Sequence, residues 1–208
     1  FSNSGKNFAT GHWRGEVKVW DLSGYRIINS FGGGTSPIND LSYSNGGNYI
    51  ISSGGQNYLQ LWNMERNELE KKLYGHSGKA NLVSFSNIKK RLYSAGKDGS
   101  IIIWDTETGN EVAKMVSTGN EWVTLTPEGY YNASENGADL LNVRIGKKVY
   151  SMDNFFETYY RPDIVKAKLA GEDIAYLMED DIRKETFQPP EVTIVSPESG
   201  HSARSEQV

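Results

Sequence analysis

The chain has 208 residues, with 22 Lys and Arg against 26 Asp and Glu, so its formal net charge is −4. No apolar run approaches the ~20 residues that a membrane-spanning helix needs, and the mild acidity gives no support to nucleic-acid binding. Cysteine is absent, which excludes a disulfide framework, cysteine zinc ligands and a cysteine nucleophile within these residues.

In chain order, the sequence repeats itself with a period of 42 residues. Three similar segments cover residues 1–10, 43–52 and 85–94. Each is followed by a glycine-rich turn and an alternating apolar strand that ends in a tryptophan, at Trp20, Trp62 and Trp104. A fourth, degenerate copy covers residues 125–134 and lacks the terminal tryptophan. A period of about 40–45 residues with short strands and a Trp-Asp ending is typical of a β-propeller blade.

The third repeat resembles the WD-repeat propeller family at four specific positions. It carries the hydrogen-bonding tetrad of that family, His76, Ser94, Asp98 and Trp104. A buried imidazole that joins a turn carboxylate to a strand hydroxyl, with the hydroxyl reaching the indole N–H, satisfies every polar group. We therefore expect these four residues to have a structural role.

The first two repeats depart from the tetrad. Thr10 and Ser52 keep the hydroxyl, but Arg14 and Gln56 replace the aspartate, and Gly34 replaces the histidine of the second repeat. Because a partial polar network contributes less than a complete one, we expect packing to hold these two blades.

The repeats predict an all-β fold with about four visible blades of a larger propeller. Their bounds are residues 1–34, 35–75, 76–116 and a reduced blade at 117–151. Closed propellers usually have about 4–8 blades, and the first blade lacks its innermost strand, which we expect just before Phe1. By family resemblance, the whole ring would have about seven or eight blades.

A short helical extension is predicted over residues 152–188. Aromatic residues between 155 and 160 recur four apart, so a short helix would carry an aromatic face, with Asp153 as its cap. Tyr130, Tyr131, Tyr159 and Tyr160 could form an aromatic patch, but we expect the helix to bury them against the last blade.

Two further helices complete the extension. Pro162 fits the first turn of a helix that runs through Leu169 and ends at Gly171. Residues 174–182 show a helical apolar stripe, and the acidic run at 179–181 is interpreted as its solvated face.

Residues 189–208 are predicted to begin a following β domain or to form a disordered tail. The double proline at 189–190 interrupts the helical pattern, and residues 191–197 have the composition of a strand. Residues 198–208 are polar.

Residues 117–197 also resemble the region after the propeller in bacterial multidomain WD-repeat proteins. The resemblance lies in residues 121–134, 155–165 and the Pro-Pro-x-Val strand. Many of those proteins continue into an immunoglobulin-like segment and a caspase-like cysteine protease domain. The resemblance implies that the catalytic cysteine and histidine of such a domain would lie beyond Val208.

The three histidines indicate no metal or cofactor site. His76 belongs to the tetrad, His12 is interpreted as a surface residue, and His201 lies in the polar tail. Metal-ligand spacings such as His-x-His or His-Glu-x-x-His do not occur in the sequence. We expect neither a cofactor nor a bound metal.

A hydrolase is one alternative function, because some propellers are glycosidases that use two carboxylates. Asp40, Asp98, Asp105 and Glu128 lie at expected turns or strand ends, where acidic residues serve as caps and turn residues. A hydrolase with carboxylates in a central channel remains an alternative. Two converging carboxylates, one with a raised pKa, would favour it.

The candidate partner surface consists of Trp13, Arg14, Gln56 and Lys97. By family resemblance, the turns that carry the tetrad aspartate face the narrower rim, where partners commonly dock. Tryptophan and arginine dominate the energetics of protein interfaces. The alternative for Trp13 is packing beneath a neighbouring blade.

The sequence thus favours a non-enzymatic interaction, scaffold or sensor module that binds a protein or peptide and regulates a downstream domain. We expect no nucleic-acid or membrane partner. A third hypothesis is a structural protomer whose open propeller edges pair with the missing blades or with another copy, because exposed strand edges invite pairing.

Overall fold

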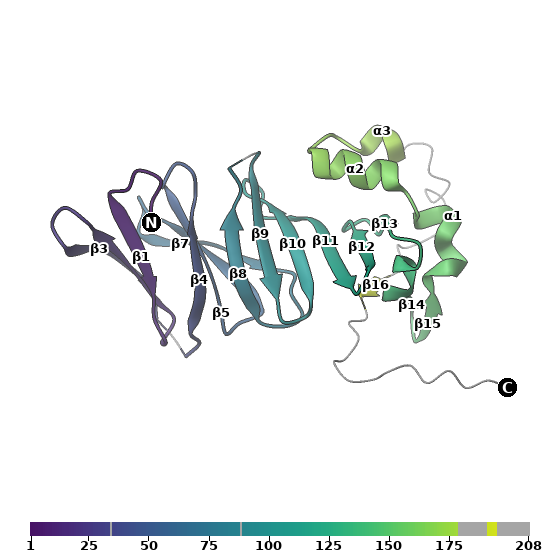
Figure 1. Cartoon of the computed structure of the whole chain (residues 1–208), viewed down its shortest axis with the longest axis horizontal. Helices are drawn as coiled ribbons and strands as arrows, with labels where there is room; N and C mark the ends of the chain where they lie inside the picture. Colours follow the sequence, from purple (N-terminus) through teal and green to yellow (C-terminus); the bar gives the residue numbers. More distant parts are fainter. Residues whose placement is uncertain (34, 88, 179–190, 195–208) are drawn as a thin grey trace.

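The computed structural model describes residues 1–33, 35–87, 89–178 and 191–194. It shows antiparallel sheets standing side by side in a row, with short helices at the end opposite the N-terminus (Figure 1). The all-β fold class is confirmed.

The first three sheets correspond to the first three predicted blades. The first contains β1 (Asn7–Gly11), β2 (Glu16–Asp21) and β3 (Arg26–Gly32) in that order. The second contains β4 (Ile38–Tyr43), β5 (Tyr49–Gly54), β6 (Tyr58–Asn63) and β7 (Glu68–Tyr74). The third begins with β8 (Ala80–Phe85), β9 (Arg91–Gly96), β10 (Ser100–Asp105) and β11 (Glu111–Thr118).

The three blades share irregularities at matching repeat positions. The register between the tryptophan-bearing strand and the outer strand shifts just before Trp20, Trp62 and Trp104. The following turn holds a residue in the left-handed region at Tyr25, Asn67 and Gly109, with φ of 50°, 54° and 77°. The 42-residue period therefore extends to the backbone conformation.

Buried side chains fill the spaces between neighbouring blades. Phe31 of the first blade stacks on Trp62 of the second, with ring centroids 5.6 Å apart. Trp104 is packed in the same way among Leu59, Leu73 and other apolar residues of the second blade. Removal of this apolar surface from water stabilises the stack of blades.

The predicted reduced blade at 117–151 divides between two sheets. Strands β12 (Glu121–Leu125) and β13 (Tyr131–Ala133) extend the third sheet, whose order is β13-β12-β11-β10-β9-β8. Only residues 119 and 120 separate β11 from β12, whereas residues 33–37 and 75–79 connect the earlier blades. A two-residue loop forms a tight hairpin. Strand β12 therefore pairs with β11, the outer strand of the third blade, and does not start a new blade.

A last sheet follows with the order β15-β14-β16. It contains β14 (Leu141–Ile145), β15 (Lys148–Ser151) and β16 (Glu191–Ile194), and a 3₁₀ helix at Gly137–Leu140 precedes it. The strand expected to begin a following domain therefore pairs with β14. The acidic run at 179–181, the double proline at 189–190 and residues 195–208 lie outside the described residues.

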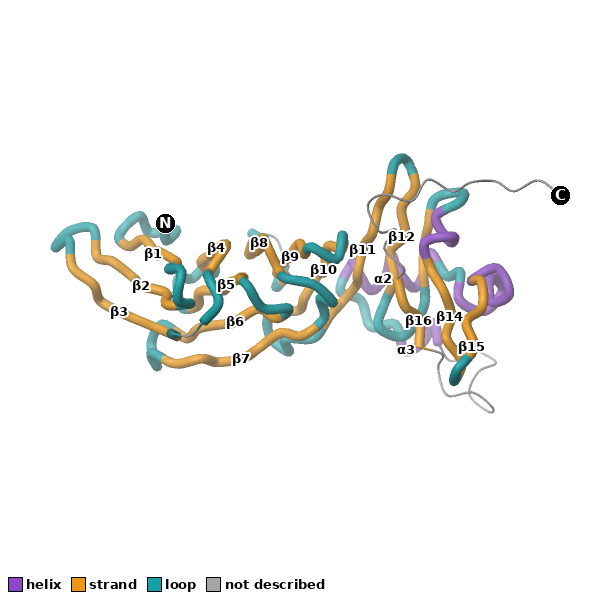
Figure 2. The backbone as a smooth tube through the Cα atoms, turned by 90° about the horizontal axis from the view of Figure 1, so that it is seen from below, coloured by secondary structure: helices purple, strands orange, loops and turns teal. Residues whose placement is uncertain are grey.

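A helical segment follows, and within it α2 lies against β11 and β13 of the third sheet (Figure 2). It consists of a 3₁₀ helix at Met152–Phe155, α1 (Phe156–Tyr159), α2 (Pro162–Ala170) and α3 (Ala175–Met178). The predicted start of α2 at Pro162 is confirmed, and so is its end at Gly171, whose φ is 77°.

Two predictions about the aromatic segment have different outcomes. Tyr130, Tyr131 and Tyr159 are buried, as expected, whereas Tyr160 is only partly buried. The cap is Ser151 rather than Asp153, because the Ser151 hydroxyl accepts a hydrogen bond from the Asp153 backbone N–H.

Candidate functional site

The four residues of the predicted tetrad form one continuous chain of hydrogen bonds in the third blade. The Trp104 indole N–H donates to Ser94 Oγ at 2.8 Å, and Ser94 Oγ lies 2.8 Å from His76 Nε2. His76 Nδ1 lies 3.1 Å from both oxygens of Asp98. Because an ionised carboxylate only accepts, the donors run from tryptophan through serine and histidine to aspartate.

Ser100 is a fifth member that the sequence reasoning missed. Its hydroxyl donates to Asp98 Oδ1 at 2.8 Å, and its backbone N–H reaches the same oxygen at 3.1 Å. Burial alone would raise the pKa of Asp98, but hydrogen bonds from His76 and Ser100 outweigh it and hold that pKa well below its usual range. The sequence signal for this contact was the Asp98-Gly99-Ser100 turn, which places the serine two residues after the aspartate.

The first blade builds a shorter version of this chain with a different histidine. The Trp20 indole donates to Thr10 Oγ1 at 3.0 Å, and Thr10 Oγ1 lies 3.1 Å from His12 Nε2. His12 is partly exposed at the surface and also hydrogen-bonded, a contact that its interpretation as a surface residue did not include. Counting by repeat period missed it, because His12 lies beyond the hydroxyl in sequence and His76 lies before it.

The second blade keeps only separate parts of the network. The Trp62 indole donates to Ser52 Oγ at 2.9 Å. Gln56, which replaces the aspartate, donates from Nε2 to Ser36 Oγ at 2.6 Å. Gly34, at the position of the histidine, lies outside the described residues.

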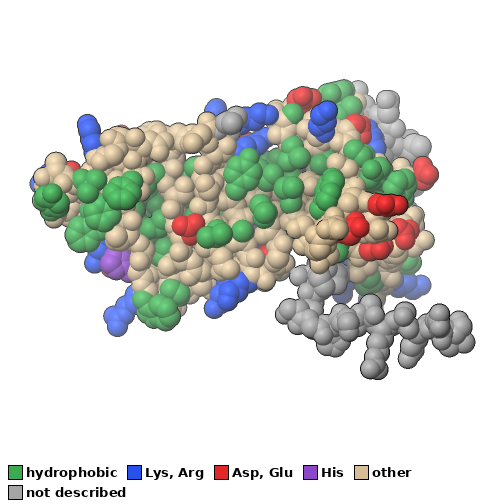
Figure 3. Space-filling model, in the orientation of Figure 1, with side chains coloured by type: hydrophobic (Ala, Val, Ile, Leu, Met, Phe, Trp, Pro, Cys, Tyr) green, Lys and Arg blue, Asp and Glu red, His purple; other side chains and the backbone are tan. Residues whose placement is uncertain are grey.

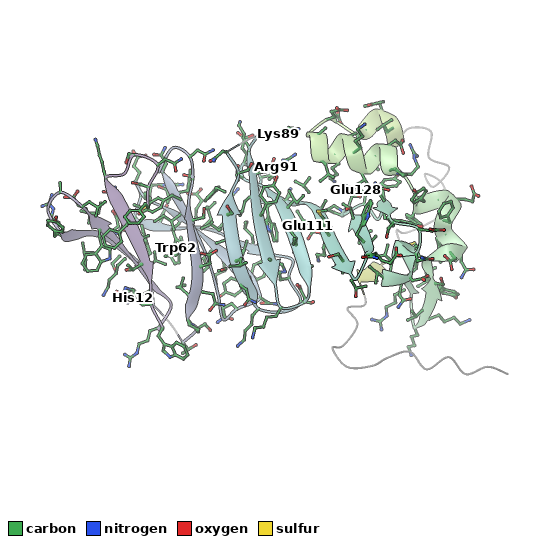
Figure 4. The ribbon with its side chains drawn as sticks, viewed as in Figure 1. His12, Trp62, Lys89, Arg91, Glu111 and Glu128 are labelled. Carbon is green, nitrogen blue, oxygen red and sulfur yellow. The ribbon has the colours of Figure 1, made fainter. Side chains whose placement is uncertain are left out.

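The candidate partner residues all lie in turns at one rim of the blades, which we call the tetrad-turn rim. Trp13 and Arg14 follow β1, Gln56 follows β5, and Lys97 follows β9. Figure 4 labels His12 at this rim, and Figure 3 shows hydrophobic and basic side chains projecting from it.

Exposure distinguishes the residues of the tetrad-turn rim. The Trp13 side chain is 81% exposed, so the alternative that it packs beneath a neighbouring blade is not observed in this chain. Arg14 and Lys97 are also exposed, whereas Gln56 is partly buried and tied to Ser36. Trp13 and Arg14 therefore form the most accessible part of the rim.

Most carboxylates considered for a hydrolase make structural contacts. Asp40 accepts the Val83 backbone N–H of the next blade at 2.9 Å. Asp105 pairs with Arg91, and Glu128 pairs with Lys168 of α2. In the described part of the chain, no hydrogen bond joins two carboxylates.

Glu111 is one carboxylate that sequence reasoning missed. Burial raises its pKa, and the nearby Lys114 lowers that pKa in part. The Lys114 ammonium lies 3.9 Å from Glu111 Oε2 and also donates to the Gly75 carbonyl at 2.8 Å. Glu111 therefore has the raised pKa that a channel hydrolase requires. In the described part of the chain, however, it makes no contact with a second carboxylate.

Metal and membrane sites were also considered. Among the described residues, no group of three or more histidine or acidic side chains is placed to hold a metal ion. In the same residues, none of the helices has the length and apolar character that crossing a membrane requires.

Comparison with known proteins decides the repeat type. The family described as "WD domain, G-beta repeat" matches residues 25–63 and 67–105. Both segments are thus similar to WD40 repeats. Each matched segment runs from the outer-strand turn of one blade to the residue after the tryptophan of the next. WD40 repeat domains are generally non-enzymatic scaffolds that bind proteins.

Two solved structures share the fold of the WD40 blades. "Structure of U3-55K" superposes with a TM-score of 0.51 at 14% identity, covering 62% of this chain and 48% of that one. "Crystal structure of RRP9 WD40 repeats" superposes with a TM-score of 0.50 at 15% identity, with the same coverages of 62% and 48%. The chain thus spans about half the length of each, and no curated protein matches it.

Proposed function

We propose that this chain is a WD40 display module that binds a protein or peptide partner through the tetrad-turn rim. The observation that carries the proposal is Trp13, which is 81% exposed beside Arg14. A large exposed aromatic next to an arginine is the composition of an interface hot spot.

The backbone around Trp13 is held in place by its neighbours. The His12 N–H donates to the Glu16 carbonyl at 2.9 Å, and the Gly15 N–H donates to the His12 carbonyl at 3.1 Å. Ile38 of the second blade also donates to the His12 carbonyl at 3.2 Å. A turn fixed before binding loses less conformational entropy when a partner docks, which supports the rim as a binding surface.

Site-specific photo-crosslinking tests this proposal. A photoreactive phenylalanine analogue replaces Trp13 in the full-length protein inside its native cells, and a second variant carries it at Val149. Val149 is a matched control, because it is 62% exposed but lies in β15 of the last sheet. We expect a crosslinked protein partner from position 13 only; equal crosslinking from both positions would refute the proposal.

We also propose that the blades regulate a following domain. This proposal rests on the resemblance to bacterial proteins that have a caspase-like domain. The close packing of α2 against β11 and β13 supports this proposal. A helix fixed to the blades would transmit a conformational change of the blades to the following domain. The mass and sequence of the complete native protein test it. We expect a following domain with a cysteine and histidine pair. A gene product without such a domain would contradict the proposal.

A further inference from the structure

A groove of about 440 Å³ lies between the second and third blades at the rim opposite the tetrad turns. Strand β9 runs from Arg91 at this rim to the turn that holds Lys97 at the other. Leu61 and Phe85 contribute apolar lining, and Lys89, Lys90 and Arg91 contribute positive charge. We call this feature the basic groove; Figure 4 labels Lys89 and Arg91 at its rim.

Three consecutive basic residues occur at this turn in the third blade alone, although the first blade has Lys6 at the position of Lys90. The matching three positions read Gly-Lys-Asn at 5–7, Gly-Asn-Tyr at 47–49 and Lys-Lys-Arg at 89–91. Gly5 and Gly47 have φ of 67° and 74°, and Lys89 adopts φ of 60° at the same place. The left-handed region strains residues other than glycine. Glycine therefore adopts the backbone conformation of this turn without strain. Lys89 adopts the same conformation in the third blade despite the strain.

Arg91 adds a buried positive charge to the wall of the basic groove. Its Nη1 donates to Asp105 at 2.8 Å, and its side chain is only 11% exposed. Its Nε is buried and has no hydrogen-bond partner among the described residues. Asp105 therefore satisfies only part of the hydrogen-bonding capacity of this guanidinium.

The positive charge of the basic groove exceeds its negative charge. Two acidic residues also line it, Glu70 and Glu107. Glu70 is bound by Arg66, and Glu107 pairs with Lys90 where both side chains are more than half exposed. An exposed pair of that kind is weak and exchanges readily with another carboxylate. The groove is thus basic on a chain whose formal net charge is −4.

We propose that the basic groove binds an acidic peptide segment of a partner protein. Carboxylates of the peptide face the exposed ammonium groups of Lys89 and Lys90, and the positive charge of Arg91 in the groove wall adds to the attraction. An apolar side chain of the peptide covers Phe85. Figure 3 shows Lys and Arg atoms gathered at the rim where the blades meet the helices. This site is separate from the tetrad-turn rim and does not depend on it.

Titration of the isotope-labelled chain with the peptide Ac-Leu-Glu-Asp-Leu-Glu-NH2 tests the proposal by NMR. We expect shifts of the amides at residues 85–91 that saturate, and that are absent with the amide version, Ac-Leu-Gln-Asn-Leu-Gln-NH2. Because both partners are charged, the affinity should fall at least threefold between 50 mM and 300 mM salt, where screening is stronger.

Three variants locate the binding. K89G restores the residue of the other blades and relieves the left-handed strain, although it removes the contact of Lys89 with the Ala170 carbonyl. It should remain folded while weakening the peptide at least threefold, and its NMR spectrum checks the fold. K90E lies at an exposed position and should weaken binding further. K148E, at an exposed position of β15 in the last sheet, is the matched control and should leave the affinity unchanged.

Several results would overturn the proposal. These are no localised shifts at 5 mM peptide, equal binding of the amide peptide, or unchanged affinity in K89G and K90E. A single-stranded oligoribonucleotide that binds residues 85–91 more tightly than the peptide would also overturn it. Loss of crosslinking at Trp13 leaves these measurements unaffected, so the two proposals fail separately.

Discussion

At the scale of single residues, Ser94 connects the polar network of the third blade. It accepts from Trp104 and contacts His76, both at 2.8 Å, and it is buried. Ser52 has the same position in the second blade but accepts only from Trp62 and donates weakly to the Gln60 carbonyl at 3.4 Å. The two serines therefore form a matched pair in complete and incomplete networks.

Replacement of Ser94 by alanine should destabilise the protein more than replacement of Ser52. S94A leaves two buried partners unsatisfied, and each costs about 1–3 kcal/mol, whereas S52A leaves one. We expect a loss of about 3 kcal/mol for S94A and about 1–2 kcal/mol for S52A. Urea unfolding measures both, and equal losses would mean that the complete network adds nothing.

Asp98 should make the stability of the third blade depend on pH. Hydrogen bonds hold its folded-state pKa well below that of the unfolded chain, despite burial that opposes this shift. Its contribution is therefore complete above the unfolded pKa of about 3.9 and is lost as the pH falls below that value.

The comparison of wild type with D98N isolates this contribution. We expect a constant difference in unfolding free energy between pH 5 and 7 that shrinks below about pH 4. Urea midpoints at a series of pH values provide the measurement. A difference that grows on acidification would contradict the assigned donors.

At the scale of elements, helix α2 is held to the blades by both apolar and charged contacts. Ile164 and Val165 pack with Tyr130 in a buried cluster. Lys168 pairs with Glu128 in the turn between β12 and β13. At the far end, Lys89 donates to the Ala170 carbonyl at 2.7 Å, where a cation complements the negative end of the helix.

Replacement of Ile164 by alanine should release α2 from the blades. A buried Ile→Ala change costs about 2–5 kcal/mol, and these contacts belong to α2 rather than to the stack of blades. We expect faster hydrogen exchange in residues 162–170 with little change in β8–β10. K166A, at an exposed position of the same helix, is the control. Equal acceleration throughout the chain would show that α2 and the blades unfold as one unit.

The sequence could predict α2 but not the neighbours of its ends. Pro162 and Gly171 are local signals, because one fits a first helical turn and the other the left-handed cap. The contacts of Lys89 with α2 depend on tertiary structure that no local pattern encodes. The place of β12 beside β11 in the third sheet follows instead from a loop of two residues, a local signal that the count of repeats did not take into account.

At the scale of the whole molecule, the chain is a row of sheets whose two rims carry different chemistry. The 42-residue period predicted the blades, and the family resemblance implied a common rim for Trp13, Gln56 and Lys97. It did not predict that Trp13 is exposed, because packing between blades is not encoded in the period. The basic groove also escaped notice, since its residues come from two neighbouring blades and oppose one another only after folding.

The most direct test is the dissociation constant of the partner crosslinked at position 13, measured for wild type and for W13A. A hot-spot tryptophan contributes at least about 2 kcal/mol, so W13A should bind at least about thirtyfold more weakly. V149A, altered in the last sheet, should bind like the wild type. Equal affinities of W13A and wild type would contradict the assignment of the tetrad-turn rim as the binding surface.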